Sequence, residues 1–224
     1  LSSRMGVSAV LGFQDGNEKD ETYLAACVKH FASYGAVEAG RDYNTVDMSY
    51  ERFYNLYQKS YQAAIDAGAK LVMLSFNTFN GIPVTIHEYL VKTVLRQEMG
   101  FNGVIISDYD ALHQVIAHGA VADDYHAAIK GLNASLDIEM GSNAYLNHGK
   151  EIIKTSPGLI KAIDESVYRI LKLKEELKEN DVDGIEEGCD QEDLKEGIRD
   201  IASGATYTDA RAEYVYFSRP YRYE

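Results

Sequence analysis

Near the middle of the chain stands the stretch Gly103-Val104-Ile105-Ile106-Ser107-Asp108-Tyr109, an apolar run that ends on a carboxylate. The run is too short and too continuously apolar for an amphipathic helix, and buried strands of parallel sheets have this pattern. Three further runs share it, at residues 24–31, 70–76 and 135–140. We therefore predict four buried parallel strands.

Helical patterns lie between and after these runs, with apolar residues spaced three and four apart at residues 50–67, 87–99, 123–132 and 159–177. Strands that alternate with helices indicate βα units around a parallel sheet, so the predicted fold class is α/β with about four units. A doubly wound sheet and half of an eight-unit barrel both fit this period. The period alone does not choose between them.

The composition is that of an ordinary globular chain of 224 residues, with 46% hydrophobic and 25% charged residues. A net charge of −13 argues against nucleic acid or an anionic membrane as the main partner. Two cysteines form no disulfide framework, and Cys27 is expected to be a small buried core residue. The first residues do not form a signal peptide but resemble the middle of an amphipathic stretch, so we expect a cytoplasmic protein whose N-terminus is truncated.

The end of the chain differs from the rest. Residues 181–193 contain seven acidic and no basic residues, so we expect residues 178–224 to form an acidic, partly disordered tail or linker. A calcium loop at residues 181–184 is disfavoured because the remaining ligand spacing is absent. Residues 214–217 are compatible with one more strand. The remaining residues, 1–177, are expected to form one unit.

Ligands of parallel α/β folds bind where the strands end. Asp108 ends its strand, which fits either a catalytic carboxylate or the N-cap of the next helix. Lys29 and His30 end another strand and are suited to binding sugar hydroxyls or a phosphate, while Lys29 alone could form a Schiff base. Strict alternation would place these two side chains on opposite faces. The other histidines lack metal-ligand spacing and are expected at the surface or in packing roles, so we expect no metal or cofactor.

Five ordered motifs together resemble glycoside hydrolase family 3, especially its β-glucosidase branch. They are KHFASYG (29–35), GRDYN (40–44), VMLSFN with a following NGIP (72–77 and 80–83), LRQEMGFNGVIISDY (95–109) and ASLDIEM (134–140). The last motif has Ser135 where the family usually has glycine. The likeness runs from about residue 2 to residue 177 and implies the C-terminal half of a (β/α)8 barrel.

The resemblance implies specific roles. Asp108 would be the nucleophile of a retaining β-glycosidase, attacking the anomeric carbon to form a covalent glycosyl-enzyme. The other residues that the resemblance assigns to the substrate-binding site are Lys29, His30, Met73, Phe76 and Tyr109, with Arg41 on the loop beside it. Arg41 and Asp42 are expected to brace their loop rather than to touch substrate, and Tyr109 stands where tryptophan is commoner. The motif around Ser33 differs from the N-acetylglucosaminidase branch, which favours a β-linked glucoside or xyloside as substrate.

The family's general acid/base lies in a second domain, and the upstream half of its barrel binds the sugar. We therefore expect this chain to need a partner chain, a second copy of itself or a missing domain for full activity. The alternative is a catalytically inactive half-barrel that serves as an assembly or carbohydrate-binding module. A lyase or aldolase that uses Lys29 is a third possibility, but it leaves the SDY sequence at 107–109 unexplained.

Overall fold

The computed structural model describes residues 1–16 and 23–177. The expectations for the acidic tail, for a calcium loop at residues 181–184 and for a strand at residues 214–217 lie outside the described residues. Among the helices of residues 1–16 and 23–177, none combines the length and the apolar character that a membrane span requires.

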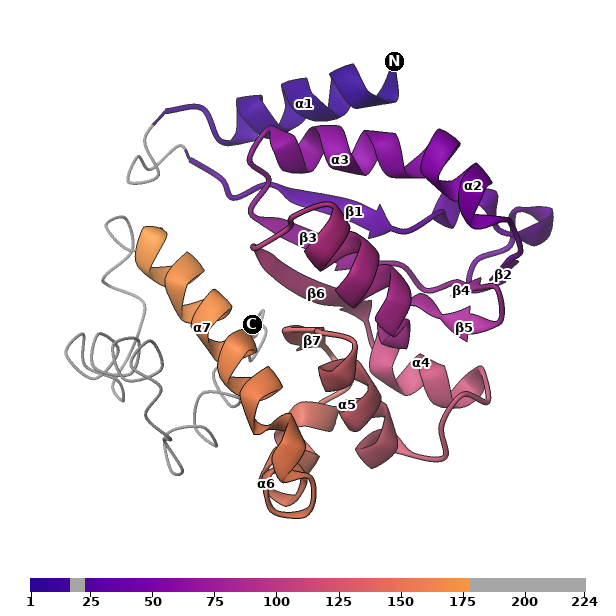
Figure 1. Cartoon of the computed structure of the whole chain (residues 1–224), viewed down its shortest axis with the longest axis vertical. Coiled ribbons are helices and arrows are strands. Elements are labelled where there is room, and N and C mark those ends of the chain that lie inside the picture. The colour runs from indigo at the N-terminus through magenta and orange to yellow at the C-terminus, as the bar shows by residue number, and fades with distance from the viewer. Residues whose placement is uncertain (17–22, 178–224) are drawn as a thin grey trace, which may run out of the picture.

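A parallel sheet of four strands forms the centre of the molecule (Figure 1). The strands are β1 (Cys27–Phe31), β3 (Leu71–Leu74), β6 (Val104–Tyr109) and β7 (Ile138–Met140). Each pairs in parallel with the next, in the order β1-β3-β6-β7. The four strands predicted from the apolar runs are thereby confirmed.

The order of the strands in the sheet is also their order along the chain. A doubly wound sheet reverses direction at a switch point, whereas a barrel adds each strand to the same side of the previous one. The sheet is therefore wound as part of a (β/α) barrel. This resolves the choice that the sequence period left open, and the fold is an α/β partial barrel with four parallel units.

Helices follow the strands at the predicted places, with some differences in bounds and type. The predicted helix at 50–67 consists of α2 (Tyr50–Arg52), the π-helical η3 (Phe53–Gln58) and α3 (Lys59–Asp66). The one predicted at 87–99 is the π-helical η5 (Tyr89–Glu98). The last two are α5 (Asp124–Asn133) and α7 (Ile160–Glu176), the latter preceded by the short η6 (Pro157–Leu159).

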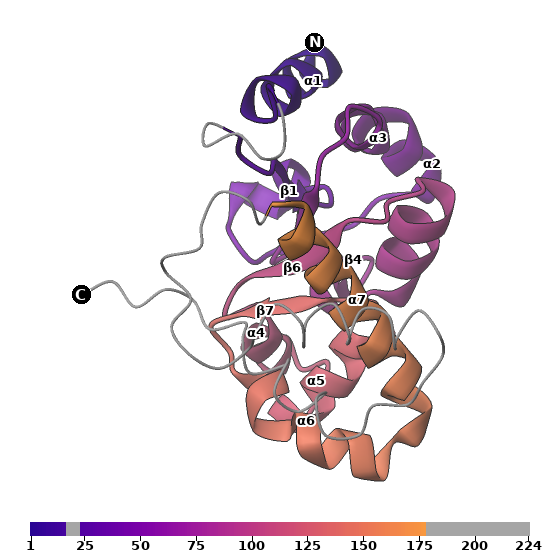
Figure 2. The ribbon, with the colours of Figure 1, turned by 90° about the vertical axis from the view of Figure 1, so that its left-hand side faces the viewer.

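Several elements were not predicted. They are α4 (Ala111–Ala117), α6 (Ala144–Thr155), the single turns η1 (Tyr34–Ala36), η2 (Glu38–Gly40) and η4 (Val84–Ile86), and a small second sheet of β2 (Thr45–Val46), β4 (Thr78–Phe79) and β5 (Ile82–Pro83). The first helix, α1 (Ser2–Phe13), packs on α3, as Figures 1 and 2 both show.

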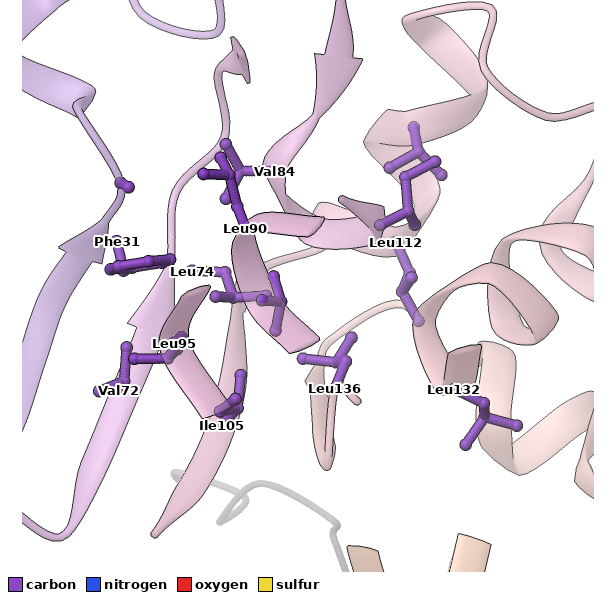
Figure 3. Packing of buried hydrophobic residues seen from close by; sticks show 14 of the residues in the cluster. Phe31, Val72, Leu74, Val84, Leu90, Leu95, Ile105, Leu112, Leu132 and Leu136 are labelled. Atoms are coloured by element: carbon purple, nitrogen blue, oxygen red, sulfur yellow. The ribbon is translucent and has the colours of Figure 1, made fainter. Parts of the chain in front are cut away.

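The core lies between the sheet and the helices (Figure 3). Val72 of β3 lies beside Leu95 of η5, and Leu90 of η5 lies beside Val84; these side chains and that of Ile105 on β6 are fully buried. Residues that alternate with these strand positions face the other way. Met73 and Ile106 are paired in register on that opposite face and are only half buried. The face that bears Met73 is therefore less covered than the face that carries the helices.

Cys27 departs from its prediction, because its side chain is exposed rather than part of the core. It begins β1, which is an edge strand of the sheet in the described part of the chain. A residue on an edge strand lacks a neighbouring strand on one side, so an apolar sequence environment does not ensure burial.

A buried ion cluster joins the sheet to two helices. The carboxylate of Asp137, just before β7, accepts hydrogen bonds from Arg96 of η5, from Arg169 (2.8 Å) and Ser166 (2.8 Å) of α7, and from the backbone N–H of Ile105 (2.8 Å). Burial lowers the pKa of Arg96 to about 10, while the charge of Asp137 opposes that change. Arg96 therefore remains charged at neutral pH and fixes η5 and α7 to the strand.

Candidate active site

Two of the predicted site residues meet at the carboxyl ends of the strands. Nε2 of His30, on β1, lies 3.2 Å from Oδ2 of Asp108, on β6. Strand β3 lies between these two strands, so the contact spans a neighbouring strand. Both side chains are mostly but not fully buried, with 26% and 15% of their surfaces exposed. A carboxylate and an imidazole, both partly exposed, therefore meet at the carboxyl end of the sheet.

The side chain of Asp108 accepts a hydrogen bond from the backbone of its own strand and does not cap the following helix. Its Oδ1 accepts a hydrogen bond from the backbone N–H of Tyr109 at 2.7 Å. The N-cap position of α4 belongs to Asp110 instead. The capping interpretation of Asp108 is therefore wrong, and its carboxylate remains available at the strand end.

Ser107 fixes the backbone at this point. Its buried hydroxyl donates to the carbonyl oxygen of Asp108 at 2.8 Å and accepts from the N–H of Met140 at 2.9 Å. The register between β6 and β7 shifts between Ile106 and Tyr109, so the serine bridges a place where regular strand pairing is interrupted. Sequence reasoning did not assign this role to Ser107, although the residue stands in the SDY sequence.

The segment that carries Lys29 and His30 is fixed in a similar way. The carbonyl of His30 accepts from the Tyr61 hydroxyl at 2.6 Å, and the carbonyl of Ala32 accepts from Ser75 at 3.3 Å and Asn77 at 3.4 Å. The SFN motif at 75–77 thus holds the end of β1. These positioning contacts were not predicted, because they join residues far apart in the sequence.

Burial and the neighbouring charges together set the pKa of His30. Burial lowers its pKa below the usual value, the neighbouring Lys29 charge lowers it as well, and the carboxylate of Asp108 partly compensates. The lowered pKa favours the neutral imidazole, whose Nε2 faces Oδ2 of Asp108. Lys29 itself is exposed. The pairing of β1 with β3 shifts between Val28 and Phe31, so strict alternation does not describe this part of the strand.

The remaining predicted residues differ in their exposure and contacts. Met73 of β3 is half buried on the face that the helices leave less covered. Phe76 follows β3 and packs against Tyr43, with ring centroids 4.5 Å apart. Tyr109 is 68% exposed at the end of β6. Arg41 is exposed. Within the described residues, no hydrogen bond or ion pair joins its side chain to Asp108.

Two further carboxylates, those of Glu139 and Asp42, make hydrogen bonds within the protein. Glu139 is buried, and its oxygens accept from the N–H groups of Ala144 and Tyr145 at 2.8 Å each, at the start of α6. Burial raises its pKa, while these hydrogen bonds oppose the rise. Glu139 therefore serves the N-terminus of a helix. Asp42 accepts a hydrogen bond from Tyr34 at 2.7 Å, which agrees with its predicted role in bracing the loop.

Comparison with known proteins accounts for this arrangement. The family model described as the glycosyl hydrolase family 3 N terminal domain matches residues 1–173. The chain belongs to glycosyl hydrolase family 3. The five motifs read from the sequence are thus those of a family member, and Asp108 stands in the motif that the family resemblance marks as its nucleophile signature.

Named relatives of this family 3 chain include β-glucosidases and β-xylosidases. A periplasmic β-glucosidase of Salmonella typhimurium is 38% identical over 177 residues, which are 79% of this chain and 23% of that protein. A β-xylosidase of Formosa agariphila is 34% identical, covering 85% of this chain and 29% of that protein. The crystal structure of a β-glucosidase from Listeria innocua matches with a TM-score of 0.76 at 39% identity, covering 96% of this chain and 29% of that one. The chain thus spans about a quarter of the length of these relatives.

Proposed function

We propose that this family 3 chain carries the nucleophile of a retaining, exo-acting β-glycosidase, with Asp108 as that nucleophile. The observation that supports the proposal most directly is the contact between His30 and Asp108 at the carboxyl ends of two barrel strands. The names of the relatives support a β-linked glucoside or xyloside as substrate.

In the first half of the proposed reaction, a carboxylate oxygen of Asp108 attacks the anomeric carbon of the sugar. A bond forms between this oxygen and the carbon, and the bond from the carbon to the leaving-group oxygen breaks. The leaving oxygen takes a proton from a general acid. In the second half, water attacks the same carbon, releases Asp108 as a carboxylate and restores the original configuration of the sugar.

His30 and Lys29 are proposed to bind hydroxyl groups of the reacting sugar. In a neutral His30 that carries its proton on Nε2, the atom that faces Asp108, Nδ1 is a hydrogen-bond acceptor. The exposed ammonium group of Lys29 is a donor only. Met73 and Phe76 would supply the apolar part of the same surface, Tyr109 an aromatic face beside it, and Arg41 an exposed donor on the neighbouring loop.

The general acid is proposed to lie outside the described residues. Glu139 does not suit the role because the N–H groups at the start of α6 occupy both of its oxygens. Full activity would then require a second domain, and the barrel would be completed by a second copy or a partner chain that pairs with edge strands β1 and β7. The mass of the chain in solution tests this part. A well-folded monomer that hydrolyses p-nitrophenyl β-glucoside would contradict it.

The nucleophile is tested with 2,4-dinitrophenyl 2-deoxy-2-fluoro-β-glucoside and the matching xyloside. Dinitrophenolate leaves without a proton, so these reagents report the first half-reaction even where no general acid is present. We expect a covalent glycosyl group on the peptide that contains Asp108, none in the Asp108→Ala variant, and unchanged labelling in Asp110→Ala. Labelling that persists in Asp108→Ala would refute the assignment.

A catalytically inactive half-barrel that acts as an assembly or carbohydrate-binding module is the alternative. It is favoured if the chain binds methyl β-glucoside or methyl β-xyloside but neither fluoro reagent labels it. The half-buried row that contains Met73 and Ile106 supports a role of this kind, because such a surface is able to accept a partner.

A further inference from the structure

A series of rings leads away from the His30–Asp108 pair. The imidazole of His30 packs edge-on against Tyr34, with centroids 5.4 Å apart. Tyr34 contacts Phe76 at 6.3 Å, and Phe76 contacts Tyr43 at 4.5 Å. The rings come from β1, from the loop that follows β3 and from the loop before β2. They form one continuous aromatic wall, which we define as His30, Tyr34, Phe76 and Tyr43.

The far end of this wall is exposed. At the end nearest Asp108 the side chain of His30 is 26% exposed, and at the far end the whole residue Tyr43 is 44% exposed. Tyr43 also has a left-handed backbone, with φ of 62°, which non-glycine residues seldom adopt. The wall therefore runs from the reacting centre outward to solvent.

The loop that carries Tyr43 is braced on both sides of the ring. The Tyr34 hydroxyl donates to Asp42 at 2.7 Å, and the N–H of Asn44 donates to the carbonyl of Arg41 at 3.2 Å. Burial of Tyr34, together with its hydrogen bond to Asp42, raises the pKa of its hydroxyl above the usual range, so the hydroxyl remains a donor. Tyr43 thus presents its ring from a fixed position.

We propose that Tyr43, with Phe76 behind it, is the platform that binds the leaving group of the substrate. The ligand class is a β-linked sugar or aryl aglycone with a flat apolar face, which stacks on an aromatic ring while its polar edge stays in water. This inference rests on the proposed function, because Asp108 defines where the reacting sugar ends. Because the wall extends from His30 beside Asp108 out to Tyr43, the reacting sugar lies near His30 and the leaving group lies near Tyr43.

A bracing role for Tyr43 is the competing explanation, and the chain supplies variants that separate the two. Tyr43→Phe keeps the ring and removes only the hydroxyl. Tyr34→Phe keeps both rings and loosens the loop by removing the bond to Asp42. Tyr50→Ala is a matched control, since Tyr50 is 36% exposed and packs on Phe79 at 5.6 Å, away from the aromatic wall.

The experiment compares two inactivators that differ only in the leaving group. One is 2-deoxy-2-fluoro-β-glucosyl fluoride, whose fluoride is too small to contact a platform. The other is 2,4-dinitrophenyl 2-deoxy-2-fluoro-β-glucoside, whose leaving group is a flat ring. Rates of covalent labelling are measured by intact mass for each variant, and the ratio of the aryl rate to the fluoride rate is the readout.

We expect Tyr43→Ala to lower this ratio by roughly three- to tenfold, the fold-change that corresponds to one lost aromatic stacking contact. Tyr43→Phe, Tyr34→Phe and Tyr50→Ala should keep the ratio of the unaltered chain. An unchanged ratio in Tyr43→Ala would overturn the proposal. An equal fall in Tyr34→Phe would also overturn it, because bracing alone would then explain the effect.

If the proposed function itself is wrong, the result differs from an unchanged ratio of labelling rates in Tyr43→Ala. If neither reagent labels the unaltered chain, Asp108 is not a working nucleophile, and the Tyr43 proposal is decided by binding instead. The dissociation constants of phenyl β-glucoside and methyl β-glucoside are then compared by titration calorimetry. Preference for the phenyl glycoside that is lost in Tyr43→Ala supports the platform, and equal affinity of the unaltered chain for both glycosides refutes it.

Discussion

His30 and Asp108 approach within 3.2 Å although β3 separates their strands in the sheet. The contact is possible because the ends of β1 and β6 are both shaped by side-chain hydrogen bonds to the backbone. Tyr61, Ser75 and Asn77 act on the first strand, and Ser107 acts on the second. The pair of side chains therefore depends on residues that bind the backbone of His30, Ala32 and Asp108.

The first prediction concerns the pKa of His30. The Asp108 carboxylate raises this pKa and the Lys29 charge lowers it, in addition to the larger effect of burial. Asp108→Asn should therefore move the pKa of His30 further below 6.5, and Lys29→Met should move it upward. Histidine ring signals followed by NMR across pH measure both changes. Asp124→Asn, which alters the partner of His113, is the control and should leave the His30 titration in place.

The second prediction concerns the pH dependence of stability. His87 is buried, its Nε2 has no partner within the described residues, and burial lowers its pKa below 6.5. The unfolded chain then binds a proton more readily than the folded chain. The stabilisation is fully present above pH 6.5 and is lost as the pH falls from 6.5 toward the folded-state pKa.

Urea unfolding at a series of pH values tests this. His87→Asn keeps an acceptor for the N–H of Leu90 and should flatten the loss of stability below pH 6.5. His113→Gln removes an exposed histidine and should keep the slope of the unaltered chain. A slope that is the same in all three proteins would show that His87 does not contribute to it.

Much of this fold is readable from the sequence, for local reasons. Four apolar runs became the four strands, because burial on both faces of a parallel sheet demands continuous apolar residues. Helices were located because a helix that buries one face repeats its apolar residues three and four positions apart. The barrel-type winding could not be predicted from the spacing of strands and helices, since a doubly wound sheet and a barrel use the same βα units. The family resemblance was what favoured the barrel.

The site was readable only in part. Asp108, Lys29 and His30 stand at strand ends, and the parallel-sheet rule brings such positions together. The clamps formed by Ser75, Asn77 and Ser107 depend on side chains that reach across strands, which no local pattern encodes. Similarly, β2 and β4 contain two residues each, too few for a period to appear.

The third prediction concerns the buried ion cluster. Asp137→Ala would leave Arg96 and Arg169 without their shared carboxylate in a buried setting. Removing one partner of a buried pair costs about 3–5 kcal/mol. We expect a fall of that order in the free energy of unfolding, measured in urea. The exposed pair Lys161 and Glu165 is the control, and Lys161→Met should change stability by less than about 1 kcal/mol. Equal effects at the two places would contradict the structural role of Asp137.

The last prediction explains a glycine of the motif that contains Asp108. A Cβ atom at Gly103 would lie 2.2 Å from the carbonyl oxygen of Lys70 and 2.7 Å from the ring of Phe101. Gly103→Ala therefore forces backbone or core atoms apart, and overpacking of this kind costs about 1–3 kcal/mol or more. Because Gly103 directly precedes β6, the displacement is transmitted along the strand that ends at Asp108.

Gly158→Ala is the matched control, since no atom lies within 4 Å of the Cβ it would add and its backbone is not left-handed. Both substitutions reduce the freedom of the unfolded chain alike, so the difference between them isolates the steric effect. We expect Gly158→Ala to be neutral or slightly stabilising and Gly103→Ala to unfold at lower urea concentration. If the two variants unfold together, the close approach of Lys70 to Gly103 does not constrain the fold, and the glycine requires another explanation.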